Sequence, residues 1–405
     1  MERRSKRTIN KAVIAVFVLI IVYVAWGIFR PIPLIKPESA NIEIKQNTAS
    51  QLDWPNKGQS AVGFVNSDYV DSNGTQKPAP IASVAKVITA LVVLEKKPLK
   101  LGEQGPTITL TASDEQLYHN YKANDGSIVP SANGEKITQY QMLQAMMLPS
   151  ANNMSDSLAI WAFGSIDNYI KEANSYVKRN GMTNTKIGGD ASGLNPATVS
   201  TAEDLIKLGK LTMKNPVMAS IVSQQTATGI PLTTTVKNVN ILLGNSNIVG
   251  IKTGNTDEAG GAFLSASIIA PNQKPVTIIT AVLQANNLYD ALASSLSLVK
   301  SSQKAFVPVE ITKQDQVVGI YKAPWGGSAK AIATRDLTIN SFASIKPEYQ
   351  VALDPIRQST KSGDNVGQVV IKKSFQSDTK TVPIILQGEI AKPSIAWRLT
   401  HPFSI

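Results

Sequence analysis

Two residue types that often carry chemistry are almost absent from this 405-residue chain, which has no cysteine and only two histidines, His119 and His401. Without cysteine, neither a disulfide framework nor a cysteine-rich zinc site can form. A Ser-His-Asp triad has one realistic base, because His401 stands in the last residues, and a histidine-rich metal site has almost none. We therefore expect chemistry based on serine, lysine, asparagine and backbone groups, with no metal and no cofactor.

Acidic residues are in the minority, with 29 Asp and Glu against 40 Lys and Arg, which gives a formal net charge of +11. Part of this excess lies in the first residues, and the rest is scattered without a basic helix or an aromatic stripe. That pattern argues against nucleic acid as a partner. A basic body facing an anionic cell-envelope surface accounts for the charge more simply.

Charged residues are also missing from residues 12–29, an apolar run about long enough to cross a bilayer as a helix. Basic residues are dense before this run and sparse after it, which predicts a cytoplasmic N-terminus and an exported remainder. A cleaved signal peptide is the competing interpretation, but Arg30-Pro31-Ile32-Pro33 offers no small-x-small cleavage site. We expect an uncleaved, single-pass membrane anchor with an extracytoplasmic catalytic domain.

The rest of the chain divides by its hydrophobic pattern. Residues 1–11 form a basic cytoplasmic tail, and residues 30–55, polar and proline-containing, suit a linker. Residues 56–305 mix helical and strand patterns, which predicts an antiparallel sheet flanked by helices, with a helical subdomain. Residues 306–405 hold short strand-like runs separated by turns, which predicts a small all-β domain. The fold class is therefore α+β, preceded by one transmembrane helix.

The first candidate motif is Ser83-Val84-Ala85-Lys86, at the start of an apolar helix opened by Pro80. Residues three apart project from one helical face, and the unpaired N–H groups at a helix start can hold an oxyanion. A serine there, with a lysine beside it, has the features of a nucleophile and its base. The spacing alone means little, because four more Ser-x-x-Lys matches begin at Ser175, Ser297, Ser301 and Ser377.

Two further motifs give this one its context. Lys252-Thr253-Gly254 occurs once, at the end of an apolar strand, where a lysine, a hydroxyl and a glycine can receive a carboxylate. Ser150-Ala151-Asn152 stands between two apolar helices, whereas its copies at 39–41 and 131–133 lie in polar loops. Only the copy at 150–152 is expected to be held rigidly.

The order Ser-x-x-Lys, Ser-x-Asn, Lys-Thr-Gly resembles the motif set of penicillin-recognising serine enzymes. The segments 190–196, 200–205 and 250–260 extend the likeness to the low-molecular-weight D-alanyl-D-alanine carboxypeptidases, serine peptidase family S11, from about residue 55 to the end. The resemblance implies a β-lactamase/transpeptidase-like catalytic domain that removes the terminal D-alanine from peptidoglycan stem peptides. It also implies that β-lactams bind covalently.

The resemblance implies a role for each catalytic residue. Ser83 would attack the carbonyl between two D-alanines and become acylated, while Lys86 takes its proton, provided that nearby Lys252 keeps the Lys86 amine partly neutral. Ser150 would relay a proton to the leaving amine. Backbone N–H groups of Ser83 and Asn255 would form the oxyanion hole.

The same likeness implies a substrate-binding set. Asn152 would hold the substrate amide, and Lys252 with Thr253 would receive the terminal carboxylate, next to Gly254. One departure concerns residues 285–290, where family members often carry an arginine that helps to hold this carboxylate and this chain has none. A second is that the family's usual tether is a C-terminal amphipathic helix, whereas here the anchor is expected at the N-terminus.

Three other functions remain open on the residues alone. A DD-endopeptidase of the same family, cutting cross-links, cannot be separated by sequence. A β-lactamase is less favoured, because the only glutamates between Asn152 and Lys252 are Glu172 and Glu203, and neither has a setting suited to activating a deacylating water. A non-catalytic wall-binding protein would not need a helix-start serine with two lysines.

Overall fold

The computed structural model describes residues 2–40, 42, 45–46, 51–270, 275–342, 345, 347–373 and 380–402. The chain forms two compact units. The larger unit is Ala49–Phe306, and the smaller unit joins Met1–Thr48 to Val307–Ile405. The division at Phe306 lies next to the boundary expected between residues 305 and 306.

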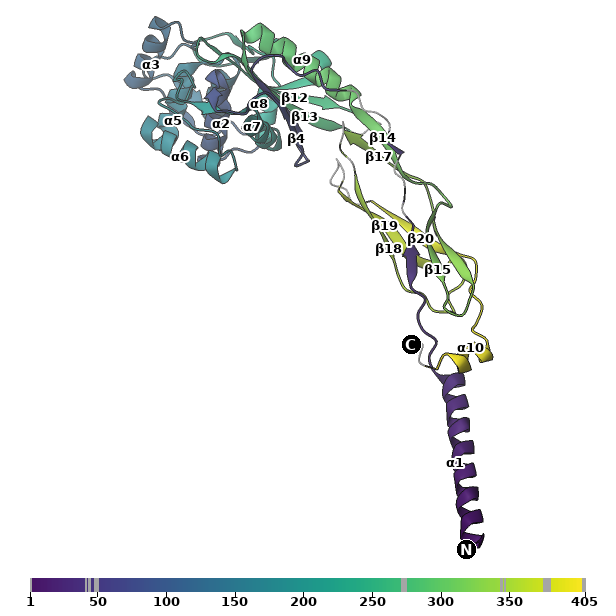
Figure 1. Cartoon of the computed structure of the whole chain (residues 1–405). Helices are drawn as coiled ribbons and strands as arrows, with labels where there is room; N and C mark the ends of the chain where they lie inside the picture. The colour runs from purple at the N-terminus through teal and green to yellow at the C-terminus, as the bar shows by residue number, and fades with distance from the viewer. Residues whose placement is uncertain are drawn as a thin grey trace. The chain divides into compact units, whose positions relative to one another are not determined.

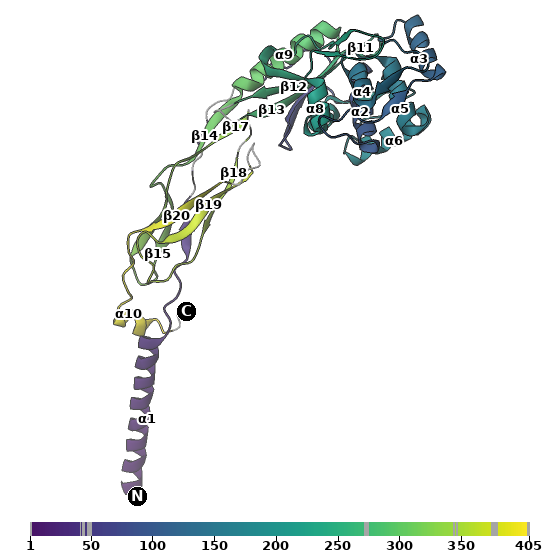
Figure 2. The same ribbon diagram turned by 180° about the vertical axis from the view of Figure 1, so that it is seen from behind.

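The larger unit is built on a five-stranded antiparallel sheet with the order β11-β12-β13-β3-β4. β11 therefore stands at one edge, and Figure 2 shows it close to the helical part of the unit. The strands of this unit are β3 (Gln59–Phe64), β4 (Val70–Asn73), β5 (Ala79–Pro80), β6 (Thr107–Thr109), β7 (Lys136–Thr138), β8 (Val199–Ser200), β9 (Thr226–Thr228), β10 (Thr235–Lys237), β11 (Ile248–Thr256), β12 (Gly260–Ile269) and β13 (Val276–Ala285).

Helices lie on both faces of this sheet (Figure 1). They are η1 (Ala82–Val84), α2 (Ala85–Lys96), α3 (Ala112–Ala123), α4 (Gln139–Met147), α5 (Asn152–Phe163), α6 (Ile166–Arg179), α7 (Ala202–Lys214), α8 (Pro216–Val222), η2 (Asn245–Asn247) and α9 (Leu288–Lys304). On one face, Ser295 of α9 contacts the hydroxyls of Ser265 and Thr280. On the other, Gly209 of α7 lies so close to Ile279 that a methyl group there would be 2.4 Å from its side chain. Alternating side chains along each strand thus serve two helical layers.

Side-chain caps define where several of these helices start. The hydroxyls of Thr138, Ser165 and Thr201 each accept a hydrogen bond from a backbone N–H in the first turn of α4, α6 and α7, and the Asn287 side chain does so for α9. Such caps satisfy N–H groups that have no partner within the helix. The hydrophobic pattern predicts helices over 140–147, 166–179, 201–213 and 289–304, and these four helices begin within a residue of those starts. The predicted α+β class is confirmed.

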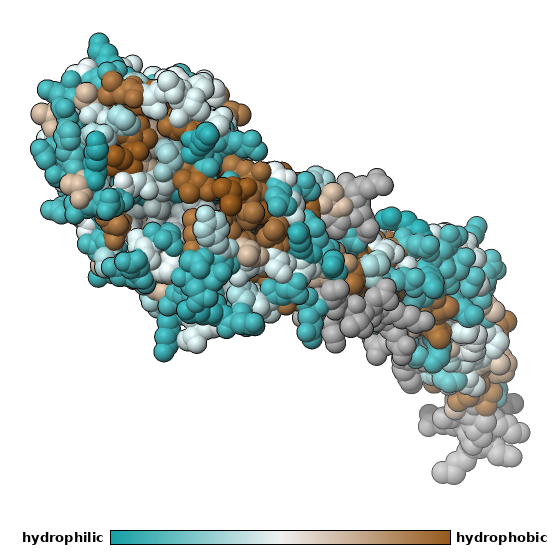
Figure 3. Space-filling view, turned by 90° about the horizontal axis from the view of Figure 1, so that it is seen from above, coloured by the Kyte–Doolittle hydropathy of each residue, from teal (hydrophilic) through white to brown (hydrophobic). Residues whose placement is uncertain are grey.

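Two helices of the larger unit were not predicted. α3 has no buried residue, so its sequence lacks the apolar stripe that marks a helix, although Thr111 and Asp114 form a capping box. α8 is short and begins with Pro216, capped by Asn215. Hydrophilic side chains cover most of the visible face of the larger unit, with patches of apolar residues between them (Figure 3).

The smaller unit holds two sheets, with the orders β1-β15-β16-β20-β19-β18 and β17-β14-β2. The sequence pattern of residues 331–339 indicates one strand-like run, but this run is divided between the two sheets, because the chain leaves β16 for β17 at residues 334–336. The elements are α1 (Glu2–Phe29), β1 (Pro37–Ser39), β2 (Lys45–Gln46), β14 (Phe306–Thr312), β15 (Val317–Lys322), β16 (Ser328–Ala333), β17 (Leu337–Phe342), β18 (Glu348–Leu353), β19 (Asn365–Lys373), β20 (Thr381–Gln387) and α10 (Ile395–Thr400).

Residues 30–55 differ from the linker that their composition suggests. β1 pairs with β15, β2 pairs with β14, and Ile35 forms a bridge with Ile356, so this stretch supplies strands to the smaller unit. Residues 41, 43–44 and 47–50 of the expected linker lie outside the described residues. The strands are too short to show an alternating apolar pattern, which is why the sequence did not reveal them.

The C-terminal helix α10 packs on the end of α1. The guanidinium of Arg398 donates to the carbonyl oxygens of Gly27, at 2.9 Å, and Arg30, while Tyr23 Oη donates to the Leu399 carbonyl. The last carbonyls of a helix have no partner within it, so Arg398 caps α1 from the far end of the chain. A methyl group on buried Gly27 would be 2.9 Å from Leu399, which shows how closely the two helices approach.

Candidate active site

The predicted nucleophile sits in a tight turn where β5 passes into a helix. Ala82 adopts a positive φ of 45°, a conformation uncommon for any residue with a side chain. Ser83 follows in η1, and Lys86 lies in the first turn of α2. Nζ of Lys86 is 2.8 Å from Oγ of Ser83. The strained turn thus presents the hydroxyl to the amine.

The Lys86 amine has two further partners, and both are oxygen acceptors. Nζ donates to Oδ1 of Asn152 at 2.7 Å and to the carbonyl oxygen of Ser192 at 3.0 Å. A neutral amine has two N–H bonds and one lone pair. When those N–H bonds point at Asn152 and Ser192, the lone pair faces the Ser83 hydroxyl, which is the arrangement a general base requires.

Burial favours the neutral form of this amine. Lys86 is fully buried, and desolvation, followed by the positive charge of Lys252, brings its pKa well below the usual lysine value. The carboxylates of Asp190 and Asp156 act in the opposite direction and raise the pKa. The proton state of Lys86 is therefore a balance between one cation and two anions.

Asn152 enters the site from the junction of α4 and α5, and Ser150 stands two residues before it. Ser150 is 6% exposed and has a positive φ of 66°, so the chain turns sharply just before α5. The Asn152 N–H donates to the carbonyl of Ser127 at 2.7 Å, and the next residue, Asn153, bonds with both backbone groups of Val129. These bonds fix the Asn152 side chain beside Lys86.

The strand β11 brings the Lys-Thr-Gly motif against the nucleophile turn. A methyl group on Gly254 would lie 2.8 Å from the Ile81 carbonyl oxygen and 3.2 Å from Ser83 N. Only glycine permits this approach without displacement of the strand. Asn255, the next residue, is exposed at the end of the same strand.

Lys252 and Thr253 are 2% and 3% exposed, although both are polar. Nζ of Lys252 donates to the carbonyl oxygen of Thr253 at 3.1 Å. Burial lowers the pKa of Lys252 to about 7, so its positive charge is itself sensitive to pH near neutrality.

Three residues that sequence reasoning gave no role support this site. Asp190 accepts backbone N–H bonds from Ser192 at 2.7 Å and Gly193 at 2.6 Å, and its second oxygen accepts from Asn195 at 2.6 Å. This turn places the Ser192 carbonyl at Lys86. The third supporting residue is Asp156 of α5, whose negative charge raises the pKa of Lys86. Asp190 and Ser192 stand in a segment that carried the family resemblance, whereas nothing in the sequence around Asp156 marks it.

Two other positions considered earlier have plain structural settings. His119, the one realistic base for a Ser-His-Asp triad, is exposed on α3, and its imidazole faces Glu115 at 4.0 Å. At residues 285–290, Asn286 accepts a hydrogen bond from Lys57 Nζ at 2.5 Å and donates to Asp290 at 2.8 Å. A lysine from the segment before β3 thus reaches the region that lacks an arginine.

Comparison with known proteins places this geometry in context. The profile of the D-alanyl-D-alanine carboxypeptidase family, serine peptidase family S11, matches residues 68–287. The D-alanyl-D-alanine endopeptidase of Escherichia coli is 29% identical over 269 residues, covering 65% of this chain and 82% of that protein. The E. coli D-alanyl-D-alanine carboxypeptidase DacA is 26% identical over 325 residues, covering 76% and 77%.

A solved structure shows the same fold. Penicillin binding protein 5 from Haemophilus influenzae aligns over 85% of this chain and all of its own length, with a TM-score of 0.59 and 18% sequence identity.

Proposed function

This chain belongs to the D-alanyl-D-alanine carboxypeptidase family of serine peptidases, and on that premise we propose that Ser83, Lys86 and Ser150 perform its catalysis. The substrate-binding set is Asn152, Lys252, Thr253, Gly254 and Asn255. Family membership makes the chain a hydrolase of D-Ala-D-Ala peptides. The contacts of Lys86 with Ser83 and Asn152 support the roles proposed for these residues.

Acylation starts at the Ser83 hydroxyl. Its oxygen attacks the carbonyl carbon between the two D-alanines while its proton passes to the neutral Lys86 amine. The carbonyl π electrons move to oxygen, and the resulting oxyanion is held by the backbone N–H groups of Ser83 and Asn255. Collapse of this intermediate breaks the C–N bond, and the leaving amine takes a proton through Ser150. The products are an acyl-Ser83 enzyme and free D-alanine.

Deacylation reverses the proton path. Water attacks the ester carbonyl and gives a proton to the Lys86 amine. Ser83 recovers a proton as its bond to the acyl group breaks, and the shortened peptide leaves. A β-lactam opens by the same attack, but its amine stays tethered to the acyl group and blocks the departure that a peptide allows. We therefore expect a persistent covalent adduct on Ser83.

The observation that carries this proposal is the arrangement of Lys86, with two strict acceptors on its N–H bonds and Ser83 Oγ 2.8 Å from Nζ. The test compares labelling by a fluorescent penicillin in wild type, Ser83→Ala and Lys86→Ala. Each single change should lower the acylation rate by about a thousandfold or more, and the double variant should be no slower than either single variant. Normal labelling of Lys86→Ala would contradict the assignment.

Carboxypeptidase and endopeptidase activities remain the two candidate specificities, and the relatives carry both names. The cleaved bond is formed by D-alanine in both, and the difference is whether the leaving amine belongs to free D-alanine or to a cross-linked peptide. Release of D-alanine from a pentapeptide, measured beside cleavage of a cross-linked dimer, separates them.

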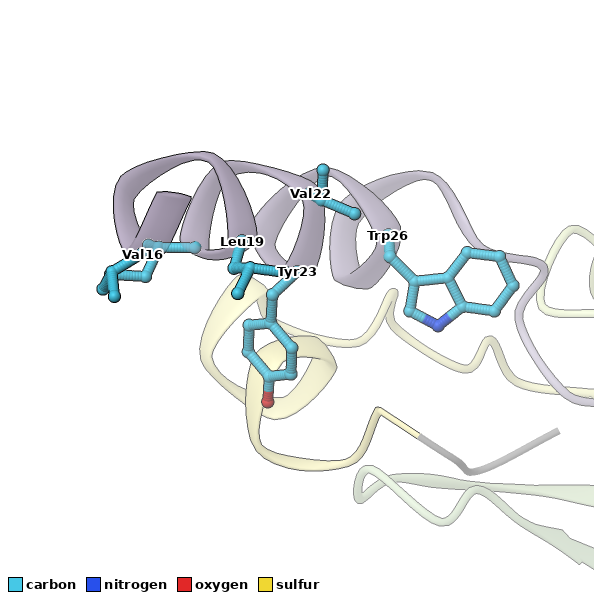
Figure 4. Close-up of a pocket in the computed structure, with 6 residues that line it drawn as sticks. Val16, Leu19, Val22, Tyr23 and Trp26 are labelled. Carbon is cyan, nitrogen blue, oxygen red and sulfur yellow. The ribbon is translucent and has the colours of Figure 1, made fainter. Parts of the chain in front are cut away.

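A retained membrane anchor completes the proposal. Within the described residues one helix, Asn10–Phe29, is long and apolar enough to cross a membrane. Figure 4 shows Val16, Leu19 and Val22 standing out from α1, with Tyr23 reaching toward the C-terminal helix. Cleavage after α1 would remove Gly27 and Tyr23, which bond with Arg398 and Leu399, so the packing of α10 on α1 supports retention. Protein extracted from its native membrane should therefore begin at Met1 or Glu2, and a start beyond Phe29 would overturn this.

A further inference from the structure

Asp156 is a buried carboxylate behind the Lys86 amine, and the reaction as described does not use it. It lies in α5, one helical turn after Asn152, and is 5% exposed. Its Oδ2 accepts a hydrogen bond from Tyr121 Oη at 2.6 Å, and its Oδ1 accepts one from the Ala191 N–H at 2.9 Å. The residue thus joins α3, α5 and the segment after α6.

The Ala191 peptide is held from the other side as well. Its carbonyl oxygen accepts hydrogen bonds from Ser155 Oγ at 2.5 Å and Thr89 Oγ1 at 2.7 Å. The next carbonyl in the chain, that of Ser192, accepts from Lys86. Asp156 therefore fixes the backbone one residue away from an acceptor of the catalytic amine.

Charge reaches Lys86 from three directions. Lys252 of β11 supplies the positive charge, while Asp156 of α5 and Asp190 of the following segment supply the negative charges. Tyr121 and Tyr169 lie near the two carboxylates. Burial raises the pKa of both tyrosine hydroxyls, so they are neutral and add no charge. Both oxygens of Asp190 accept backbone N–H groups of the turn that follows it, so a substitution there would disturb that turn. Asp156 is the carboxylate whose charge can be removed with least change to the backbone.

We propose that Asp156 is a positioning residue that acts through Lys86: its carboxylate fixes the Ala191 peptide and supplies negative charge that opposes Lys252 across the amine. The inference rests on the proposed role of Lys86 as the base. The hydrogen bonds of the Asp156 carboxylate go to Tyr121 and Ala191, not to the reacting serine.

The pKa of Asp156 adds a second consequence. Desolvation raises it to about 6, against hydrogen bonds from Tyr121 and Ala191 that lower it. Above that pH the carboxylate is charged and raises the pKa of Lys86. Below that pH Asp156 is neutral, so the pKa of Lys86 falls and the amine stays unprotonated to lower pH. In wild type the loss of acylation rate on the acidic side of the pH profile, its acidic limb, is therefore spread over a wider pH range.

The experiment measures the acylation rate by a penicillin against pH in Asp156→Asn. Asparagine can still accept from the Ala191 N–H but carries no charge, so the acidic limb should move to lower pH by on the order of one unit. The matched control is Asp204→Asn. Asp204 is also buried, at 1% exposed, and accepts from Asn184 N and Thr185 Oγ1, but it does not face Lys86. Its limb should stay in place.

A second variant covers the case in which Asp156→Asn does not fold. Tyr121→Phe keeps the carboxylate but removes the donor that stabilises its charge, so the pKa of Asp156 rises and the limb should move in the same direction by a smaller amount. If the acidic limb of the acylation rate stays at the wild-type pH in both folded variants, or shifts equally in Asp204→Asn, the inference about Asp156 is wrong while the proposed function stands. Normal acylation by Lys86→Ala overturns the inference and the proposed function together.

Discussion

At the scale of single residues, two buried lysines share one site and are held differently. Burial and the charge of Lys252 lower the pKa of Lys86, while Lys252 itself donates to the carbonyl oxygen of Thr253. Burial lowers the pKa of Lys252 to about 7, so under the proposed function the free enzyme loses part of the charge that receives the substrate carboxylate as the pH rises through neutrality. A bound carboxylate would restore that proton, so binding and protonation are linked.

The affinity for a D-Ala-D-Ala peptide should therefore fall above about pH 7. Lysine is charged below its pKa. Above that pH, binding of a peptide requires Lys252 to take up a proton from solution, which lowers the affinity by up to about tenfold per pH unit. Calorimetric binding to Ser83→Ala, which cannot react, gives this profile without interference from turnover. In the Ser83→Ala, Lys252→Met double variant binding should be weak and its pH slope lost. A slope retained there would assign the effect to another group.

Sequence reasoning could propose the site residues that lie in short motifs, because their spacing is itself the signal. Ser83 and Lys86 are brought together within one helical turn, and Lys252 is recognisable from its neighbours. Asp156 and the Ser192 carbonyl were missed because their roles depend on which segments meet in space. A carboxylate on a buried helix has no local signature, and a carbonyl has none at all.

At the scale of elements, the nucleophile turn is enclosed by two glycines from different segments. Gly193 has a positive φ of 78°, and a methyl group on it would lie 2.1 Å from the Ala82 carbonyl oxygen and 2.6 Å from the Ala85 side chain. Any side chain there would push the turn that carries Ser83 away from the segment that supplies the Ser192 carbonyl. The contact is with backbone, so it cannot be relieved by a rotamer change.

Replacement of Gly193 by alanine should thus reduce acylation well beyond its cost in stability. Gly229 is a matched control, because its φ is 76° and nothing lies within 4 Å of a methyl group there. Both alanine variants should lose about 1 kcal/mol from the left-handed backbone alone. Only Gly193→Ala should also lower the penicillin acylation rate, by about tenfold or more. Thermal unfolding and acylation kinetics, measured on the same preparations, distinguish the two effects.

Elements with a strong periodic pattern were predictable, and those without one were not. α6 and α9 have apolar residues at helical spacing. Their bounds, like those of the central strands β12 and β13, lie within two residues of the ranges that the sequence predicts, 166–179, 289–304, 262–270 and 276–283. α3 buries no residue, yet it supplies Tyr121 to the cluster behind Lys86. β1 and β2 gain their stability from partners far along the chain, so no local pattern could mark them.

At the scale of the whole molecule, every proposed site residue lies in the larger unit, Ala49–Phe306. The smaller unit has a core of its own, including Val318, Tyr321 and Ile384, each fully buried. A soluble fragment 49–306 should therefore fold and be acylated by penicillin at a rate within about threefold of the full chain. A folded fragment that resists acylation would mean that the smaller unit takes part in the chemistry.

The smaller unit is made of two chain segments that are far apart in the sequence, and this bears on the order in which the two units can fold. β1 and β2 leave the ribosome early, but their partners β15 and β14 are translated only after the whole larger unit. During synthesis from the N-terminus, the larger unit can therefore fold first, while β1 and β2 have no strand partners. Arg398 is translated long after α1, the helix that it caps. The smaller unit is thus completed only after the larger one.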